Sequence, residues 1–301
     1  MDVAITGASG LIGTALGDSL RAAGHTVRPV VRRPSEAPGA VRWDPDAGTI
    51  DADALAGVDV VVHLAGAGIG DARLTASRKR VVLESRTRGT GLIARTVAAL
   101  DPRPRVLLSA SAVGWYGSRG DEVLTERSGP GDDFGARVCA AWEDAAQPAV
   151  DAGVRTALMR IAPVLSGRGG VLPRMALPFR FFAGGHLGSG RQWMSWVGID
   201  DLVRIVPFLV EHDEIAGPVN VTAPGPVTNR EVTAALGRVL HRPAVLPVPA
   251  PALRLVLGTE RADGLLLASQ RVVPEVLTAA GYDFLHPDID SALGAALGAA
   301  A

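Results

Sequence analysis

The chain has 301 residues, of which 48% are hydrophobic and 20% charged, and its formal net charge is -1. This near-neutral charge argues against binding of nucleic acid through a strongly basic face. A single cysteine, Cys139, excludes an intrachain disulfide and a cysteine-rich metal site. Strand-like residues begin at Asp2 and the apolar runs are short, so we expect neither a signal peptide nor a membrane span. The composition therefore predicts a cytoplasmic globular protein with no metal, nucleic-acid or membrane partner.

Short strand-like runs alternate with longer helical stretches in the first half of the chain. This alternation is typical of a parallel sheet that is covered on both faces. Because crossovers between parallel strands are right-handed, the sequence predicts an α/β fold with a doubly wound parallel Rossmann sheet. The predicted strands are 3–6, 26–31, 58–64, 105–109 and 155–161, and the predicted helices are 11–23, 75–100 and 138–150.

The second half of the chain is richer in glycine and proline loops and lacks this regular alternation. Glycine-dense loops lie at 167–170 and 184–190, a strand-like run at 219–222 and a proline-rich stretch at 243–251. We therefore divide the chain into a dinucleotide-binding Rossmann domain, residues 1–165, and a smaller substrate-binding region, residues 166–301, packed on the carboxyl edge of the sheet.

A glycine-rich turn links the first predicted strand to the first predicted helix. Its spacing, Gly7, Gly10 and Gly13, fits a tight turn, a close approach of backbone to a pyrophosphate, and a close helix–strand contact. The N-terminus of the helix then offers N–H groups and a positive dipole end to phosphates. The predicted cofactor contacts here are Gly7, Ser9, Gly10, Leu11, Ile12 and Gly13.

The end of the second predicted strand indicates which dinucleotide is bound. Arg32 and Arg33 stand where a site that prefers NAD would have an acidic residue for the ribose hydroxyl. Guanidinium groups accommodate the additional 2′-phosphate of NADP. A solvated basic turn is the alternative, and Glu36 is also near enough in sequence to reach the ribose. The charge pattern favours NADP(H) as the cofactor.

Segments along the whole chain carry a family resemblance. The glycine turn and the sequence His63-Leu64-Ala65-Gly66 resemble those of the extended short-chain dehydrogenase/reductases, which include nucleotide-sugar epimerases and dehydratases. More specifically, the chain resembles the atypical branch known as the epimerase family, or NAD-dependent epimerase/dehydratase-like proteins. The other segments that carry the resemblance are 78–79, 85–86, 109–114, 131–134, 188–196, 199–201 and 268–272.

The resemblance implies further site residues. Leu64, Ala65 and Gly66 would line the adenosine–pyrophosphate side of the cofactor. Arg86 stands where the wider group commonly has an asparagine near the cofactor, and its guanidinium would pair with phosphate or lie on the helix surface as a solvated charge. Ser111 would hydrogen-bond the reacting oxygen of the substrate. Analogy with the family also suggests a homodimer.

The catalytic pair of the wider family is missing. That pair is a tyrosine and a lysine four residues later, and the only lysine here is Lys79. On the helix that normally carries the pair, Gly135 takes the tyrosine position and Cys139 the lysine position. Tyr116 is a candidate proton donor from a loop expected to overhang the nicotinamide, whereas Cys139 is more simply a buried, inert thiol.

Three other features each allow a structural and a functional interpretation. Asp133 precedes a predicted helix, where capping explains it better than a general-base role. Capping and domain docking are also the simpler roles for Asp200 and Asp201. Trp193 and Trp196 either form the wall of a substrate cleft or cover the sheet edge.

Two functions follow. The first is an NADP(H)-dependent oxidoreductase or epimerase-like enzyme that acts on a small polar or sugar-like molecule, with Ser111 and Tyr116 at the reacting centre. Hydride transfer depends mainly on proximity and a closed cleft, so it does not strictly require the Tyr-Lys pair. The second is a non-catalytic NADPH-binding regulatory or scaffold protein, which the missing pair favours.

Overall fold

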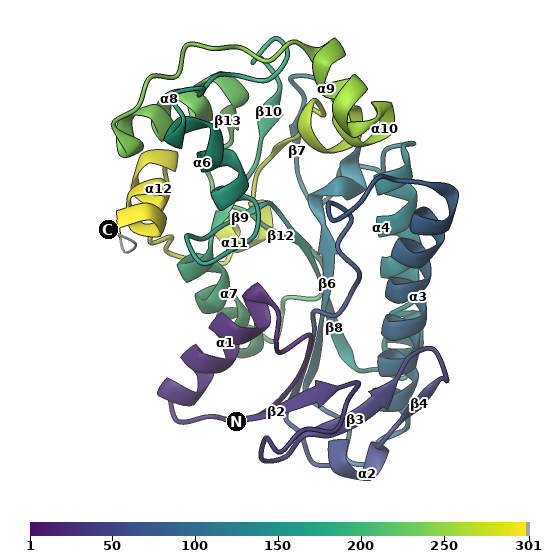
Figure 1. Ribbon diagram of the computed structural model, residues 1–301. Coiled ribbons are helices and arrows are strands. Elements are labelled where there is room, and N and C mark those ends of the chain that lie inside the picture. Colours follow the sequence, from purple (N-terminus) through teal and green to yellow (C-terminus); the bar gives the residue numbers. More distant parts are fainter. Residues whose placement is uncertain (299–301) are drawn as a thin grey trace.

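A mostly parallel β-sheet forms the centre of the molecule (Figure 1). The computed structural model describes residues 1–298, and within them this sheet has eight strands, ordered β12-β8-β6-β5-β1-β2-β3-β4. All pair in parallel except β4, which is antiparallel to β3. The chain builds one side of the sheet outward from β1 and then returns to the other side of β1, which confirms the doubly wound Rossmann fold. The strands are β1 (Asp2–Thr6), β2 (Thr26–Val31), β3 (Val41–Asp44), β4 (Thr49–Ile50), β5 (Val60–His63), β6 (Val106–Ala112), β8 (Arg155–Ile161) and β12 (Gly217–Val221).

Helices cover both faces of this sheet (Figure 1). Successive side chains of a strand point to opposite faces, so Val3 and Ile5 of β1 lie in one core and Ala4 in the other. Burial on both faces explains why these strands read as continuous apolar runs. No helix within residues 1–298 combines the length and apolar character needed to cross a bilayer. The first face is covered by α1 (Leu11–Ala22), α7 (Ile199–Glu211) and α11 (Glu275–Ala279), and the second by α3 (Ala76–Ala99), α4 (Phe134–Asp144) and α5 (Gln147–Asp151).

The helix predicted at 138–150 is two helices, α4 and α5, and begins earlier than predicted. Asp133 caps α4, because its carboxylate accepts a hydrogen bond of 2.8 Å from the Ala136 N–H. The break before α5 has a simple cause. Pro148 lies in the first turn of α5, and a proline can neither donate a helical N–H bond nor fit against the carbonyl four residues earlier.

A second core lies above the carboxyl edge of the sheet (Figure 1). It surrounds Trp196 and is built by α6 (Leu172–Arg180), α8 (Asn229–Leu240) and α12 (Ile289–Gly298). The remaining elements are short: α2 (Ala52–Leu55), η1 (Val113–Tyr116), β7 (Val123–Leu124), β9 (Val164–Leu165), β10 (Trp193–Met194), β11 (Val197–Gly198), β13 (Val227–Thr228), α9 (Ala250–Leu257), α10 (Thr259–Arg261), η2 (Ala262–Leu266) and β14 (Arg271–Val272).

Part of the predicted second region belongs to the central sheet. β12 pairs in parallel with β8, with Val221 opposite Ile161, and α7 packs against α1. The C-terminal segment is held to this layer by Asp201, which is fully buried and accepts hydrogen bonds from the N–H groups of Leu285 and His286. Asp201 therefore fastens the C-terminal segment to α7, and both lie within residues 166–301.

Candidate functional site

The glycine turn after β1 lies at the point where the strand order reverses. Gly7 has φ +68°, a left-handed conformation that glycine adopts without strain. A Cβ at Gly13 would overlap the Gly7 carbonyl oxygen, so the first turn of α1 packs directly against the glycine turn. The first helical hydrogen bond runs from Thr14 to Gly10, and the Gly10 N-cap has no side-chain capping bond. The N–H groups of residues 11–13 thus precede the helical ladder and are available to an anion.

A cavity of about 270 Å³ opens over this turn. Six predicted cofactor residues line it, and Ser9 is exposed beside them. Three further residues were not predicted to contact the cofactor: Val164 of β9, Gly170 of the glycine-dense loop 167–170, and Val171, which precedes α6. The complete lining is Gly7, Gly10, Leu11, Ile12, Gly13, Leu64, Val164, Gly170 and Val171.

The loop after β5 is fixed to the glycine turn by one hydroxyl group. Thr6 Oγ1 accepts hydrogen bonds from the N–H groups of Leu64 (3.0 Å) and Ala65 (3.1 Å). Its own hydroxyl proton is then available for Nδ1 of His63, 2.8 Å away. A Cβ at Gly7 would lie 3.1 Å from the backbone of this loop. Thr6 therefore holds the two predicted cofactor-binding loops side by side.

His63 is neutral in this arrangement. The side chain is fully buried, edge-on to Trp43, and desolvation lowers the pKa of the imidazole to about 4. With Nδ1 accepting from Thr6, the proton resides on Nε2, which has no polar partner within residues 1–298. His63 therefore carries no charge at neutral pH, and its role is to hold the hydroxyl group of Thr6, which in turn fixes the loop.

Arg32 and Arg33 follow β2 at the same edge of the sheet as the glycine turn. The register places Val30 opposite Thr6, so both chains leave the sheet together. Both guanidinium groups are exposed, and neither has an ion-pair partner in the described part of the chain. Glu36 is also exposed. Both arginines are therefore open to solvent near the glycine turn, and their contact with a cofactor stays a prediction.

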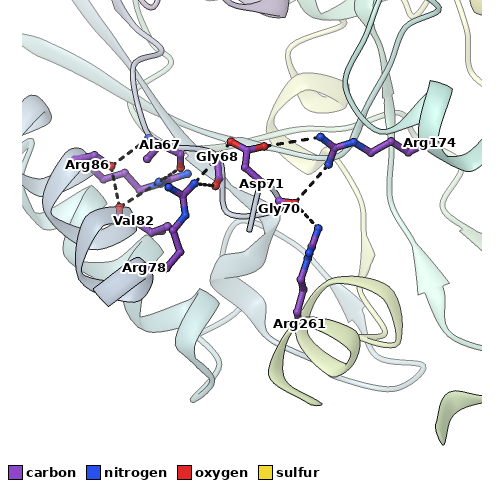
Figure 2. Close-up of polar contacts among 10 residues, drawn as sticks. Ala67, Gly68, Gly70, Asp71, Arg78, Val82, Arg86, Arg174 and Arg261 are labelled. Atoms are coloured by element: carbon purple, nitrogen blue, oxygen red, sulfur yellow. Dashed lines mark hydrogen bonds and ion pairs between the residues drawn. The ribbon is translucent and has the colours of Figure 1, made fainter. Parts of the chain in front are cut away.

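Arg86 lies under the loop that follows β5 (Figure 2). Its Nη1 donates to the carbonyl oxygens of Ala67 (2.7 Å) and Val82 (3.1 Å), and the guanidinium stacks 4.6 Å from the Trp142 ring centroid. A Cβ at Gly66 would lie 3.5 Å from this side chain. Arg86 therefore supports the predicted cofactor loop from below, and its contact with phosphate stays a prediction.

Ser111 lies at the carboxyl end of β6 and is only 3% exposed. Its hydroxyl donates to Glu143 Oε1 at 2.6 Å. The same carboxylate accepts two hydrogen bonds of 2.9 Å from Arg160 on the neighbouring strand β8. Its proton is therefore committed to Glu143, Ser111 is not among the residues that line the cavity over the glycine turn, and its contact with a substrate stays a prediction.

Tyr116 was predicted to overhang the cofactor, but the structure places it in the protein interior. The side chain is 0% exposed, and its hydroxyl donates to Asn220 Oδ1 at 2.7 Å while accepting from Arg160 Nη1 at 3.1 Å. Burial raises the pKa of the phenol. The cause of the discrepancy is η1, a single tight turn after β6 that directs the ring inward, into a small core with Val113 and Leu124.

The helix that normally carries the Tyr-Lys pair has no group suited to proton transfer at those two positions. Gly135 has no side chain, and Cys139 is 4% exposed. Desolvation, together with the nearby Glu143 carboxylate, raises the pKa of the Cys139 thiol to about 12. The expected inert thiol thus agrees with its surroundings.

The two tryptophans differ in their surroundings. Trp196 is fully buried in the second core and donates to the Gly225 carbonyl oxygen at 3.0 Å. Trp193 is half-buried, donates to Asp121 at 2.9 Å and stacks on Arg271 at 4.2 Å. Packing therefore accounts for Trp196, whereas Trp193 presents its ring to a guanidinium.

The buried ion pair of Glu143 and Arg160 was not predicted from the sequence. One signal was available, because Arg160 interrupts an apolar strand that is buried on both faces. A charge in such a strand requires a partner of opposite charge. Nothing in the sequence, however, identifies Glu143 as that partner.

The sequence is similar to family profiles and to known proteins over most of its length. The sequence profile of the NAD dependent epimerase/dehydratase family matches residues 3–222, and one described as a domain of unknown function, DUF1731, matches residues 248–296. Epimerase family protein Mb2239 of Mycobacterium bovis is 44% identical over 292 residues, which cover 97% of this chain and 96% of that protein. Epimerase family protein YfhF of Bacillus subtilis is 36% identical, covering 97% of each chain.

A solved structure is also similar over its whole length. The crystal structure of human epimerase family protein SDR39U1 (isoform 2) with NADPH superimposes with a TM-score of 0.90 at 33% sequence identity, covering 99% of both chains. The likeness includes the C-terminal region as well as the central sheet.

Proposed function

Because this chain belongs to the NAD dependent epimerase/dehydratase family, we propose that it binds NADP(H) and transfers hydride between the nicotinamide and a small polar or sugar-like molecule. Membership of the family confirms the resemblance noted in the sequence. The cofactor supplies the hydride chemistry, and the protein supplies binding and orientation.

One observation carries the proposal: a cavity of about 270 Å³ lies over an uncapped helix N-terminus. Gly7 and Gly13 leave no side chain between the turn and a ligand, and the first-turn N–H groups of α1 lack helical partners. These are the donors that a pyrophosphate requires. Thr6 fixes the loop with Leu64 and Ala65 beside the turn, which supports the proposed role of this loop on the adenosine side.

The charges beside the turn support NADP(H) over NAD(H). Arg32 and Arg33 are exposed at the end of β2, where the adenosine ribose lies in Rossmann proteins. A guanidinium forms charge-assisted hydrogen bonds with a phosphate monoester, whereas a plain ribose offers it only neutral hydroxyl oxygens. The human relative SDR39U1 was crystallised with NADPH.

A second candidate is a non-catalytic NADPH-binding regulatory or scaffold protein. It is favoured by the burial of the side chains that would replace the Tyr-Lys pair: Tyr116 is 0% and Cys139 4% exposed. Ser111 is buried and donates to Glu143, which is compatible with both functions. Oxidation of bound NADPH by a small polar carbonyl compound such as glyceraldehyde, followed at 340 nm, would exclude the scaffold function, because a scaffold protein leaves the cofactor unoxidised.

The decisive experiment is titration calorimetry of the purified protein with NADPH. We expect binding to the native protein and its loss in Gly13→Ala, because the added methyl group would overlap the Gly7 carbonyl oxygen. Gly294→Ala is the matched control, since a Cβ there meets no atom within 4 Å. Absence of heat with the native protein, or equal affinities for native protein and Gly13→Ala, would contradict the proposal.

A further inference from the structure

Large apolar side chains are exposed around the C-terminal end of α6. One side of this helix packs into the second core through Phe179. Its other side exposes Leu177, and Phe181 and Phe182 follow directly after the last turn, 74% and 59% exposed. Single exposed apolar side chains are ordinary, whereas a contiguous patch of them marks an interaction site.

The segment between α8 and α9 extends this patch. It lies beside the segment that follows α6, because the Leu246 N–H donates to the Gly184 carbonyl oxygen at 2.9 Å. Val245 and Leu246 are both exposed. The segment crosses the end of the molecule farthest from α2 (Figure 1). We call the exposed side chains of the two segments the apolar face: Leu177, Phe181, Phe182, Val245 and Leu246.

The backbone of Phe182 has an unfavourable conformation. Its φ is +58°, a left-handed value that a bulky residue rarely adopts. The Phe182 N–H donates to the Phe179 carbonyl oxygen at 3.0 Å, and the Ala183 N–H donates to that of Pro178 at 2.9 Å. This pattern closes many helices, and glycine is the usual residue at the left-handed position. An exposed aromatic ring at a strained position points to a use for the ring on the surface.

The two segments that build the apolar face carry positive charge only. Residues 152–199 and 232–259 contain no aspartate or glutamate, although the chain has 31 acidic residues. The near-neutral net charge of the whole chain therefore conceals a local surface that is both basic and apolar. Short apolar runs argue against a membrane span, but a basic, apolar surface lies on a bilayer without crossing it.

Two arginines beside the apolar face, Arg180 and Arg242, are exposed and have no acidic partner in the described part of the chain. The Arg242 guanidinium lies 4.8 Å from the Phe182 ring centroid, so a cation and an exposed ring stand side by side. Arg174, farther back on α6, is already paired with Asp71. Arg180 and Arg242 are therefore available to an anionic partner.

We propose that the apolar face binds the surface of a bilayer that contains anionic phospholipids. The two phenylalanines insert at the level of the headgroups, and the two arginines pair with lipid phosphates. Aromatic and apolar side chains beside basic ones are typical of surfaces that lie in the membrane interface, and an anionic leaflet attracts each nearby arginine. A second copy of the chain fits less well, because a two-fold contact would place the arginines of one face against those of the other.

The length of α6 keeps the cofactor cavity outside the bilayer. Val171 immediately precedes this helix and lines the cavity, whereas Phe181 follows its last turn. The helix has nine residues and is therefore about 13 Å long. An interfacial segment penetrates about 5–10 Å. This inference goes beyond the proposed function and does not depend on it, and we expect NADPH affinity to be the same with and without lipid.

The test is co-sedimentation of the full chain with vesicles of phosphatidylcholine alone and with vesicles that also contain about one third phosphatidylglycerol. We expect the protein to bind the anionic vesicles at least about tenfold more tightly. Binding should weaken as the ionic strength rises, because exposed charges are screened by salt. Equal binding to both kinds of vesicle, or binding to neither, would overturn the proposal.

Phe182→Gly tests the ring without endangering the fold. It removes the inserted side chain and supplies the residue that the left-handed conformation favours, so the Tm should be at least that of the native protein. We expect binding to the anionic vesicles to weaken about tenfold, because one large apolar side chain is no longer buried. Leu285→Ser is the matched control, since Leu285 is exposed but lies outside the apolar face. Native affinity in Phe182→Gly would contradict the proposal.

Arg242→Gln tests the charge. We expect it to bind the anionic vesicles several-fold more weakly and with a smaller dependence on ionic strength. Arg80→Gln, which removes an exposed charge on α3, should bind like the native protein. Equal loss in both variants would mean that net charge alone acts, and the assigned face would be wrong.

Sedimentation velocity without lipid tests the alternative occupant. A dimer that Phe182→Gly converts to a monomer, together with absence of vesicle binding, would assign the apolar face to a second copy of the chain and overturn the membrane proposal. Failure of the native protein to bind NADPH would count only against the proposed function, because vesicle binding is measured without cofactor.

Discussion

The Glu143 carboxylate binds the Arg160 guanidinium through two hydrogen bonds of 2.9 Å, and the two side chains are only 6% and 4% exposed. The pair links α4 to β8. Burial alone would lower the pKa of Arg160, but the hydrogen bonds and charge of Glu143 more than offset it, so the pKa is raised. The guanidinium also lies 4.0 Å from the Trp115 ring centroid.

We expect Glu143→Ala to lower the free energy of unfolding by about 3–5 kcal/mol, because it leaves the buried charge of Arg160 uncompensated. Guanidinium denaturation measures the change. Asp290→Ala removes a carboxylate from an exposed pair with Arg238 and should cost less than about 1 kcal/mol. A similar loss in free energy of unfolding for both variants would contradict the prediction, because the buried pair would then contribute no more than the exposed one.

Tyr116→Phe separates a structural role of the phenol from a catalytic one. The variant removes the hydrogen bond to Asn220 and leaves a buried acceptor unsatisfied, so we expect a loss of about 1–3 kcal/mol in stability. NADPH affinity should not change, since the ring is fully buried and does not line the cavity over the glycine turn. A hundredfold loss of turnover without loss of stability would instead restore the proton-donor role predicted from the sequence.

The central sheet could be predicted because its signals are local. The 155–161 and 26–31 strands were located at their observed bounds, since each is a short apolar run next to a turn. The role of Gly7 follows from its place between a strand and a helix, where a left-handed residue is needed. The pairing of β12 with β8 could not be predicted from the sequence, because nothing within residues 217–221 specifies the sheet that this strand joins.

The polar interior could not be predicted for the opposite reason. Nothing near Arg160 in the sequence identifies Glu143, 17 residues earlier, as its partner. Their pairing depends on how α4 packs on the sheet, which is a long-range property. Tyr116 was misplaced because whether a loop residue points inward depends on one tight turn, η1.

Arg32→Ala tests the choice of cofactor. We expect the native protein to bind NADPH at least about tenfold more tightly than NADH, through a charge-assisted contact with the 2′-phosphate. The variant should bind both with similar affinity, and NADH affinity itself should not change. Arg42→Ala, on β3 outside the predicted contact, provides the comparison. Equal affinities of the native protein for the two coenzymes would remove the NADP assignment and leave the dinucleotide site intact.

His63 makes stability depend on pH in the acid range. Its folded-state pKa of about 4 lies below the ordinary value of 6.5, so the unfolded chain binds the proton first as the pH falls. The contribution is complete above about pH 7 and is lost progressively as the pH falls from 6.5 through 4. From the size of the shift, the loss amounts to about 3 kcal/mol. Denaturation at pH 7, 5.5 and 4 should show this slope, which His63→Asn should reduce. The imidazole resonance that disappears in that variant should titrate near pH 4, and a midpoint near 6.5 would show that the ring is accessible to water and that the loop it supports opens.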